Sequence, residues 1–201
     1  MAKALVIFLH GVGSNGADLA GLGQHWASVL PDVAFASPNA PMPFEHGMGY
    51  QWFSLNGVTT ENRPARVREA RAAFDATLQP LMAQHGFTDA WDKVILVGFS
   101  QGSIMALDAL ASGRHPLAGV VAFSGRLAFD GALTPQPQTP ALLIHGHADG
   151  VIPWTESESA AQRLRSAGVT IETRFEPTTG HTISSQGAME AAAFIAQCLQ
   201  D

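Results

Sequence analysis

Short apolar segments alternate with amphipathic segments along most of the chain. The apolar segments show little polar alternation, which is typical of parallel strands that are buried on both faces of a sheet. They lie at residues 5–10, 33–37, 93–99, 119–123, 141–145 and 170–175. We therefore predict six main strands in a mostly parallel sheet.

Between these strands, apolar residues recur at helical spacing. The clearest helix is expected at residues 65–85, where Val67, Phe74 and Leu78 share one face, while the arginines should form a solvated face. Further helices are expected at residues 18–29, 101–111, 155–166 and 187–200. Strands that alternate with helices predict an α/β fold in which helices cover both faces of the sheet.

Residues 38–64 fit neither pattern. The stretch holds four prolines, three glycines and an aromatic trio of Tyr50, Trp52 and Phe53. Long irregular loops in compact domains are usually functional or disordered, and the aromatic content favours a functional loop. The chain shows no repeat and no long linker, so we expect residues 1–201 to form a single domain.

Composition narrows the choice of partners and compartment. With 201 residues, of which 46% are hydrophobic, the chain can bury a core without disulfides. No apolar run reaches the roughly 20 residues of a membrane-spanning helix, and a formal charge of −6 does not attract nucleic acid. We expect no nucleic-acid partner and no stable membrane insertion, and a homodimer stays open. The single cysteine, Cys198, favours a reducing compartment such as the cytoplasm.

The strongest chemical motif follows the strand at residues 93–99. Residues 98–102 read Gly-Phe-Ser-Gln-Gly and lead into a predicted helix. This context is typical of a nucleophile held on a sharp, strained turn, because the flanking positions have room only for glycine. We predict Ser100 as the nucleophile and the backbone amide of Gln101 as an oxyanion donor. The alternative is an ordinary helix-capping serine.

A serine nucleophile needs a base and an acid that orients the base, and in this fold they follow in the order serine, acid, histidine. His181 comes directly after the last strand and before the last helix, which makes it the predicted base. Asp149 follows the strand at residues 141–145 and is the favoured acid. Asp130, after the preceding strand, remains an alternative because spacing alone does not exclude it.

A glycine-rich loop at residues 9–16 follows the first strand. Its glycines let backbone amides turn inward, so the amide of Val12 is predicted to join that of Gln101 in an oxyanion hole. The same glycines would also suit a dinucleotide phosphate. However, Pro38 and Asn39 stand after the second strand, where such a site needs an acidic residue.

Together these motifs resemble the phospholipase/carboxylesterase family, which includes small carboxylesterases and acyl-protein thioesterases. Five blocks carry the resemblance, at residues 9–13, 51–53, 98–102, 145–153 and 180–181. The resemblance implies an α/β-hydrolase fold with its N-terminal antiparallel strands reduced or absent, and we see no inserted lid domain. It also implies a triad of Ser100, Asp149 and His181.

The resemblance further places the region of Trp52 beside an acyl pocket. Trp52, Phe53 and Met48 are apolar enough to line such a pocket, and we take them as candidate substrate-binding residues. The chain departs from the usual family pattern at Ser14, Ser54 and Ser103, which lie in or beside the loops that should shape the pocket. These departures concern substrate preference rather than the triad.

The expected function is cleavage of small-molecule carboxylic esters or thioesters through an acyl-enzyme, with no cofactor and no metal. Two alternatives stay open. His145, His147 and Asp149 have the alternating spacing of a hydrolytic metal-binding motif. The other alternative is a binding protein of the same fold that has no catalytic activity, since fold does not fix function.

Overall fold

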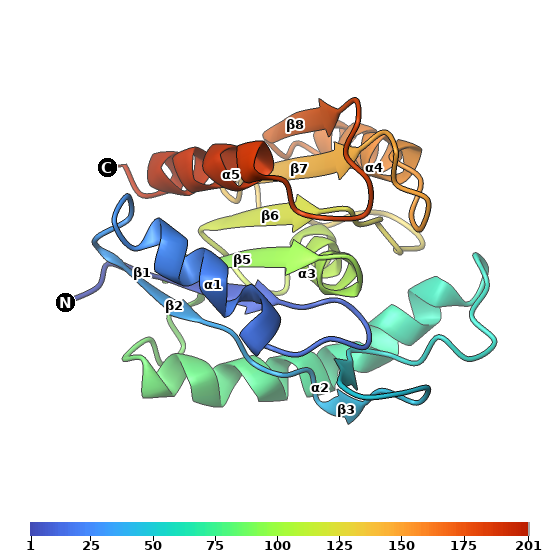
Figure 1. Cartoon of the computed structure of the whole chain (residues 1–201), viewed down its shortest axis with the longest axis horizontal. Coiled ribbons are helices and arrows are strands. Elements are labelled where there is room, and N and C mark those ends of the chain that lie inside the picture. The colour runs from blue at the N-terminus through green and yellow to red at the C-terminus, as the bar shows by residue number, and fades with distance from the viewer. Residues whose placement is uncertain (201) are drawn as a thin grey trace.

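A computed structural model describes residues 1–200 as a parallel sheet between two layers of helices (Figure 1). The sheet has six strands in the order β2-β1-β5-β6-β7-β8, and all neighbouring strands in it are parallel. The strands are β1 (Ala4–Leu9), β2 (Val33–Ala36), β5 (Val94–Phe99), β6 (Gly119–Phe123), β7 (Ala141–Gly146) and β8 (Ile171–Glu176). The predicted strands and their parallel arrangement are confirmed.

Helices cover both faces of this sheet, as predicted. Helices α1 and α5 lie on one face, and α2, α3 and α4 lie on the other (Figure 1). Their bounds are α1 (Ala17–Trp26), α2 (Arg63–Gln84), α3 (Gln101–Ser112), α4 (Thr155–Ser166) and α5 (Ser185–Cys198). None of the helices within residues 1–200 combines the length and the apolar character that crossing a membrane requires.

Strand β1 shows why the inner strands read as unbroken apolar runs. Alternate side chains of a strand point to opposite faces. Leu5 and Ile7 therefore pack with the helices of the α2–α3–α4 layer, and Val6 and Phe8 pack with those of the α1–α5 layer. All four are buried. Each fully buried side chain of this size contributes about 1.5–3 kcal/mol, so both faces of the strand must be apolar.

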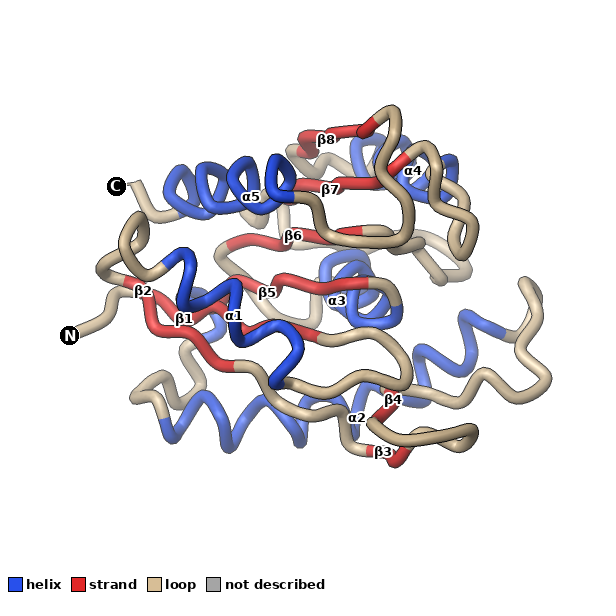
Figure 2. Tube along the Cα trace, in the orientation of Figure 1, coloured by secondary structure: helices blue, strands red, loops and turns tan. Residues whose placement is uncertain are grey.

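Because the strands are parallel, the loops that follow them gather at one edge of the sheet. Figure 2 shows these loops beyond the carboxyl ends of the strands, with the N-terminus near the opposite edge. The loops after β1, β5, β7 and β8 carry the predicted site residues. The topology thus brings together residues that lie far apart in the chain.

The stretch predicted to be irregular contains a small antiparallel hairpin, β3 (Met42–Pro43) with β4 (Tyr50–Gln51). Tyr50 joins the loop after β1 through two backbone hydrogen bonds, to Gly13 and Ser14, each of 2.8 Å. Gly49 makes this close approach feasible, since a Cβ there would lie 2.3 Å from the Gly13 oxygen. The hairpin therefore fixes the glycine-rich loop.

The arginine face of α2 is only partly solvated, which corrects our expectation. Arg71 donates two hydrogen bonds of 2.7 Å to Asp108 of α3, whose side chain is 1% exposed. Arg114 adds contacts to Asp108 at 3.3 Å and to Asp75 of α2 at 3.2 Å. A buried carboxylate needs such partners to remain charged, so these ion pairs tie α2 to α3.

Candidate active site

Ser100 occupies the sharp turn between β5 and α3 in a strained conformation, with φ of +55°. The two glycines of the motif make this turn sterically possible. A Cβ on Gly102 would lie 1.9 Å from the Leu9 carbonyl oxygen, and a Cβ on Gly98 would lie 2.6 Å from the Ser103 nitrogen. Only hydrogen fits at either position, which explains the motif in steric terms.

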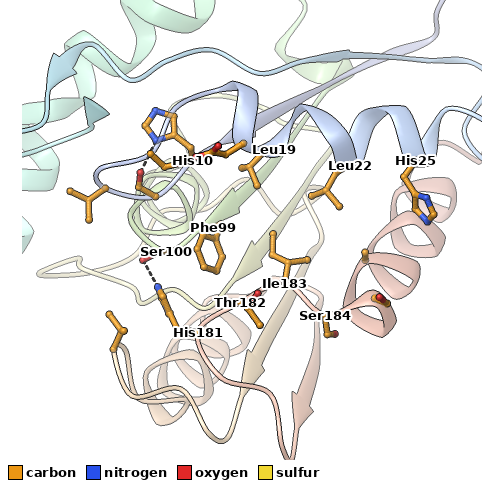
Figure 3. A pocket seen from close by; sticks show the side chains of 17 residues that line it. His10, Leu19, Leu22, His25, Phe99, Ser100, His181, Thr182, Ile183 and Ser184 are labelled. Carbon is orange, nitrogen blue, oxygen red and sulfur yellow. Dashed lines mark hydrogen bonds between the residues drawn. The ribbon is translucent and has the colours of Figure 1, made fainter. Parts of the chain in front are cut away.

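The side chains of Ser100, His181 and Asp149 form a continuous chain of hydrogen bonds. The Ser100 Oγ lies 3.0 Å from Nε2 of His181, and Nδ1 of His181 lies 2.8 Å from Oδ2 of Asp149. Figure 3 shows the ring of His181 directed at the hydroxyl. The three residues come from the loops after β5, β8 and β7 and meet at one edge of the sheet. Asp130 lies elsewhere, paired with Arg68 at 2.8 Å.

The second carboxylate oxygen of Asp149 is held by its own loop. Oδ1 accepts hydrogen bonds from the backbone amides of Val151, at 2.8 Å, and Ile152, at 2.9 Å. Burial alone would raise the pKa of Asp149, but the hydrogen bonds from His181 and from these amides outweigh it and lower that pKa. The carboxylate is therefore charged at neutral pH and oriented on both sides.

A second histidine, His145, lies buried on the other side of Asp149. Its Nδ1 is 2.6 Å from the Ser157 hydroxyl, and its Nε2 is 2.8 Å from the Ile152 carbonyl oxygen. Burial lowers the pKa of His145, so the ring is neutral. Because a carbonyl only accepts, Nε2 carries the proton and Ser157 donates to Nδ1.

The three residues whose spacing indicated a metal site, His145, His147 and Asp149, make other contacts. His145 is bonded as described above, and the exposed ring of His147 lies against Trp154 with ring centroids 4.3 Å apart. Asp149 is committed to His181. Within residues 1–200 no group of three or more histidine, cysteine or acidic side chains is arranged to hold a metal ion, so the metal hypothesis is not favoured.

The backbone amide of Val12 lies in the glycine-rich loop after β1, and that of Gln101 is the first of helix α3, directly after Ser100. Neither amide donates a hydrogen bond to any acceptor in the described part of the chain. The side chain of Gln101 is fully used: its oxygen accepts from the Trp52 amide at 2.7 Å, and its nitrogen donates to the Phe53 carbonyl at 2.8 Å. Gln101 thus links the start of α3 to the segment after the hairpin.

Trp52, Phe53 and Met48, the candidate substrate-binding residues, do not line the cavity beside Ser100. Trp52 and Phe53 are 1% and 3% exposed and belong to the core beneath the sheet edge, whereas Met48 is 92% exposed. The indole of Trp52 donates a 2.8 Å hydrogen bond to the His10 carbonyl, at the start of the glycine-rich loop. Trp52 therefore supports the glycine-rich loop.

A cavity of about 880 Å³ opens beside Ser100, between α1 and the start of α5 (Figure 3). The loops of the site and facing side chains of these two helices line it. They are His10, Gly11, Val12, Ser14, Asp18, Leu19, Leu22, His25, Phe99, Ser100, Val151, His181, Thr182, Ile183, Ser184, Ser185 and Ala188. Sequence reasoning missed the α1 residues because an apolar spacing of three in a helix also fits simple core packing.

Comparison with known proteins agrees with this geometry. Residues 1–199 match the family described as Phospholipase/Carboxylesterase. Esterase YpfH from Escherichia coli strain K12 is 33% identical over 185 residues, which cover 92% of this chain and 78% of that protein. Acyl-protein thioesterase 1 from Neurospora crassa is 27% identical over 202 residues, covering 89% and 80%.

Solved structures show the same architecture. The crystal structure of esterase PE8 superposes with a TM-score of 0.84 at 39% sequence identity, covering 98% of this chain and 94% of that one. The predicted α/β-hydrolase fold is thereby confirmed. A family match over nearly the whole length, a relative above 30% identity and a shared fold together show that the chain belongs to the phospholipase/carboxylesterase family.

Proposed function

We propose that the chain is a serine hydrolase that cleaves carboxylic esters or thioesters of small molecules through an acyl-enzyme on Ser100. The observation that carries this proposal is the chain of hydrogen bonds from Ser100 through His181 to Asp149, at 3.0 and 2.8 Å. The relatives named an esterase and an acyl-protein thioesterase support the reaction class.

The reaction follows from the position of each group. His181 Nε2 takes the proton of Ser100 as its oxygen attacks the acyl carbon, and the amides of Val12 and Gln101 stabilise the oxyanion. His181 then returns the proton to the departing alcohol or thiol, which leaves an ester on Ser100. Water then attacks the acyl carbon while His181 takes a proton from the water. His181 returns this proton to the oxygen of Ser100, which releases the carboxylic acid and the free serine.

Asp149 supports His181 without moving a proton of its own. Its carboxylate holds the ring with Nε2 toward Ser100 and stabilises the imidazolium that forms in each step. The pKa of Asp149 is lowered because hydrogen bonds outweigh burial, so this charge is present at neutral pH. The single cysteine supports a reducing compartment such as the cytoplasm.

The test is turnover of p-nitrophenyl acetate by Ser100→Ala. Loss of the nucleophile should lower kcat by at least ~10³. Ser112→Ala, at the opposite end of α3, is the matched control and should keep wild-type turnover. Wild-type activity should also persist in the presence of a metal chelator. Normal turnover by folded Ser100→Ala would refute the proposal.

A further inference from the structure

We propose that the cavity beside Ser100 binds a hydrocarbon chain of the ester, that about seven carbons of this chain lie along α1, and that the chain passes Leu22 midway. This inference rests on the proposed function, because the cavity opens at the proposed nucleophile. Figure 3 shows Ser100 and His181 at one end of the cavity and His25 at the other. A chain attached at Ser100 would run between α1 and α5.

Apolar side chains line the path between these ends. Leu19 and Leu22 lie one turn apart on α1 and face Ile183, which follows His181 by two residues (Figure 3). Phe99 borders the path next to Ser100, and Ala188 of α5 borders it farther along. Methylene groups gain free energy when such surfaces remove them from water.

Several polar residues of the lining already have partners within the protein. The hydroxyl of Ser14 donates to Asp18, and that of Ser184 donates to Glu176 at 2.5 Å. Both ring nitrogens of His10 are bonded to the backbone, at 2.6 and 2.9 Å. A polar chain would gain little from these groups, and the carboxylate of Asp18 would repel an anionic chain.

The length of α1 along the cavity sets the length of the chain. From Leu19 to His25 the helix advances six residues, or about 9 Å at 1.5 Å per residue. An extended hydrocarbon advances about 1.25 Å per bond, since bonds of about 1.5 Å meet at tetrahedral angles. About seven carbons therefore span the α1 side of the cavity as far as His25, which is exposed, and further methylenes would enter water.

The test measures kcat/KM for two ester series with chains of two to twelve carbons. One series varies the acyl chain of p-nitrophenyl esters, and the other varies the alcohol of acetate esters. In one of them, kcat/KM should rise by up to about fourfold per methylene and level off near seven carbons. The series that rises identifies which side of the ester enters the cavity. Flat profiles in both series would overturn the inference.

Two phenylalanine variants test the role of Leu22. Leu22→Phe places a larger side chain midway along the cavity, so the profile should level off at about four carbons instead of seven. Val29→Phe is the matched control, because Val29 follows α1, is 62% exposed and lies outside the cavity lining. Its profile should equal that of the wild type, and thermal unfolding checks that both variants are folded.

The outcomes separate this inference from the proposed function. If a fluorophosphonate labels Ser100 but Leu22→Phe keeps the wild-type profile, the chain-binding role of the cavity is refuted and the serine hydrolase proposal stands. If Ser100 is not labelled and Ser100→Ala keeps its turnover, both proposals fail.

Discussion

His145 Nε2 lies 3.2 Å from Oδ2 of Asp149, the same oxygen that accepts the hydrogen bond from His181. Oδ1 of the same carboxylate accepts hydrogen bonds from two backbone amides. The Nε2–H of His145 donates to the Ile152 carbonyl at 2.8 Å and lies near Oδ2. Because His145 is buried and neutral, this N–H lies near Asp149 without a competing positive charge. A protonated ring there would neutralise Asp149 and weaken its support of the His181 imidazolium.

Replacement of His145 should change catalysis through Asp149. His145→Leu removes the Nε2–H that lies near Asp149 and donates to the Ile152 carbonyl, and we expect kcat to fall about tenfold with little change in KM. Without this N–H nearby, the charge of Asp149 acts more strongly on His181, so the acid limb of the kcat/KM profile should move to higher pH. His145→Gln can place an amide N–H near the same point and should recover most of the activity.

If His145→Leu and His145→Gln lose the same activity and neither pH profile moves, His145 serves only to pack the loop. Thermal unfolding of both variants measures the packing role separately from catalysis. His145→Leu removes the partner of Ser157 and should therefore lower the stability whether or not catalysis changes.

Two buried glutamines, Gln101 and Gln51, provide a matched test of the contacts that support the segments bordering Ser100. Gln101→Leu keeps the backbone amide but leaves the Trp52 N–H and the Phe53 carbonyl without partners. Each buried unpaired group costs about 1–3 kcal/mol, so we expect a loss of about 2–6 kcal/mol in the free energy of unfolding and a lower kcat. Urea unfolding and steady-state kinetics measure both effects.

Gln51 is the control, since it is 1% exposed and its side-chain amide has no hydrogen-bond partner within the described residues. Gln51→Leu removes a buried polar group that bonds to nothing, so stability should be equal to or above that of the wild type. Equal destabilisation by the two substitutions would show that the bonds of Gln101 are unimportant.

The ion pairs between α2 and α3 should make stability depend on pH through Asp75. Burial alone would raise the pKa of Asp75, but contacts with His115 and Arg114 outweigh it and lower that pKa. A carboxyl group with a lower pKa in the folded state stabilises the protein above its unfolded pKa of about 3.9. This contribution disappears as the pH falls through the folded value.

Asp75→Asn should therefore lower the free energy of unfolding by about 1–2 kcal/mol at pH 7, and the difference from wild type should shrink toward pH 3. Urea unfolding across this range measures it, with Asp92→Asn, a change at an exposed carboxylate, as the control. A difference that stays constant with pH would contradict the assignment.

The sheet was predictable because its inner strands are apolar on both faces, a pattern few other elements share. The order of Ser100, Asp149 and His181 was also readable, since parallel strands bring their carboxyl ends to one edge. The hairpin of β3 and β4 could not be predicted from the sequence. Its strands have only two residues each, and it pairs with the loop after β1.

The lining of the cavity beside Ser100 was the hardest part to predict from the sequence. An aromatic side chain in a loop can line a pocket or fill the core, and Trp52 is buried because its indole reaches the His10 carbonyl. Conversely, Leu22 has the spacing of a core residue and packs partly against the core, but it also lines the cavity beside Ser100. Arg71 similarly fits a solvated face until the position of Asp108 is known.

The most direct test of the central claim is the site of covalent labelling by a fluorophosphonate, read by mass spectrometry of the intact protein and its peptides. We predict one adduct per chain, on Ser100, with hydrolysis of p-nitrophenyl acetate lost in proportion to labelling. Labelling should be absent in Ser100→Ala and greatly slowed in His181→Ala, because the serine then lacks its base. An adduct on another residue, or full hydrolysis after Ser100 is completely blocked, would contradict the account.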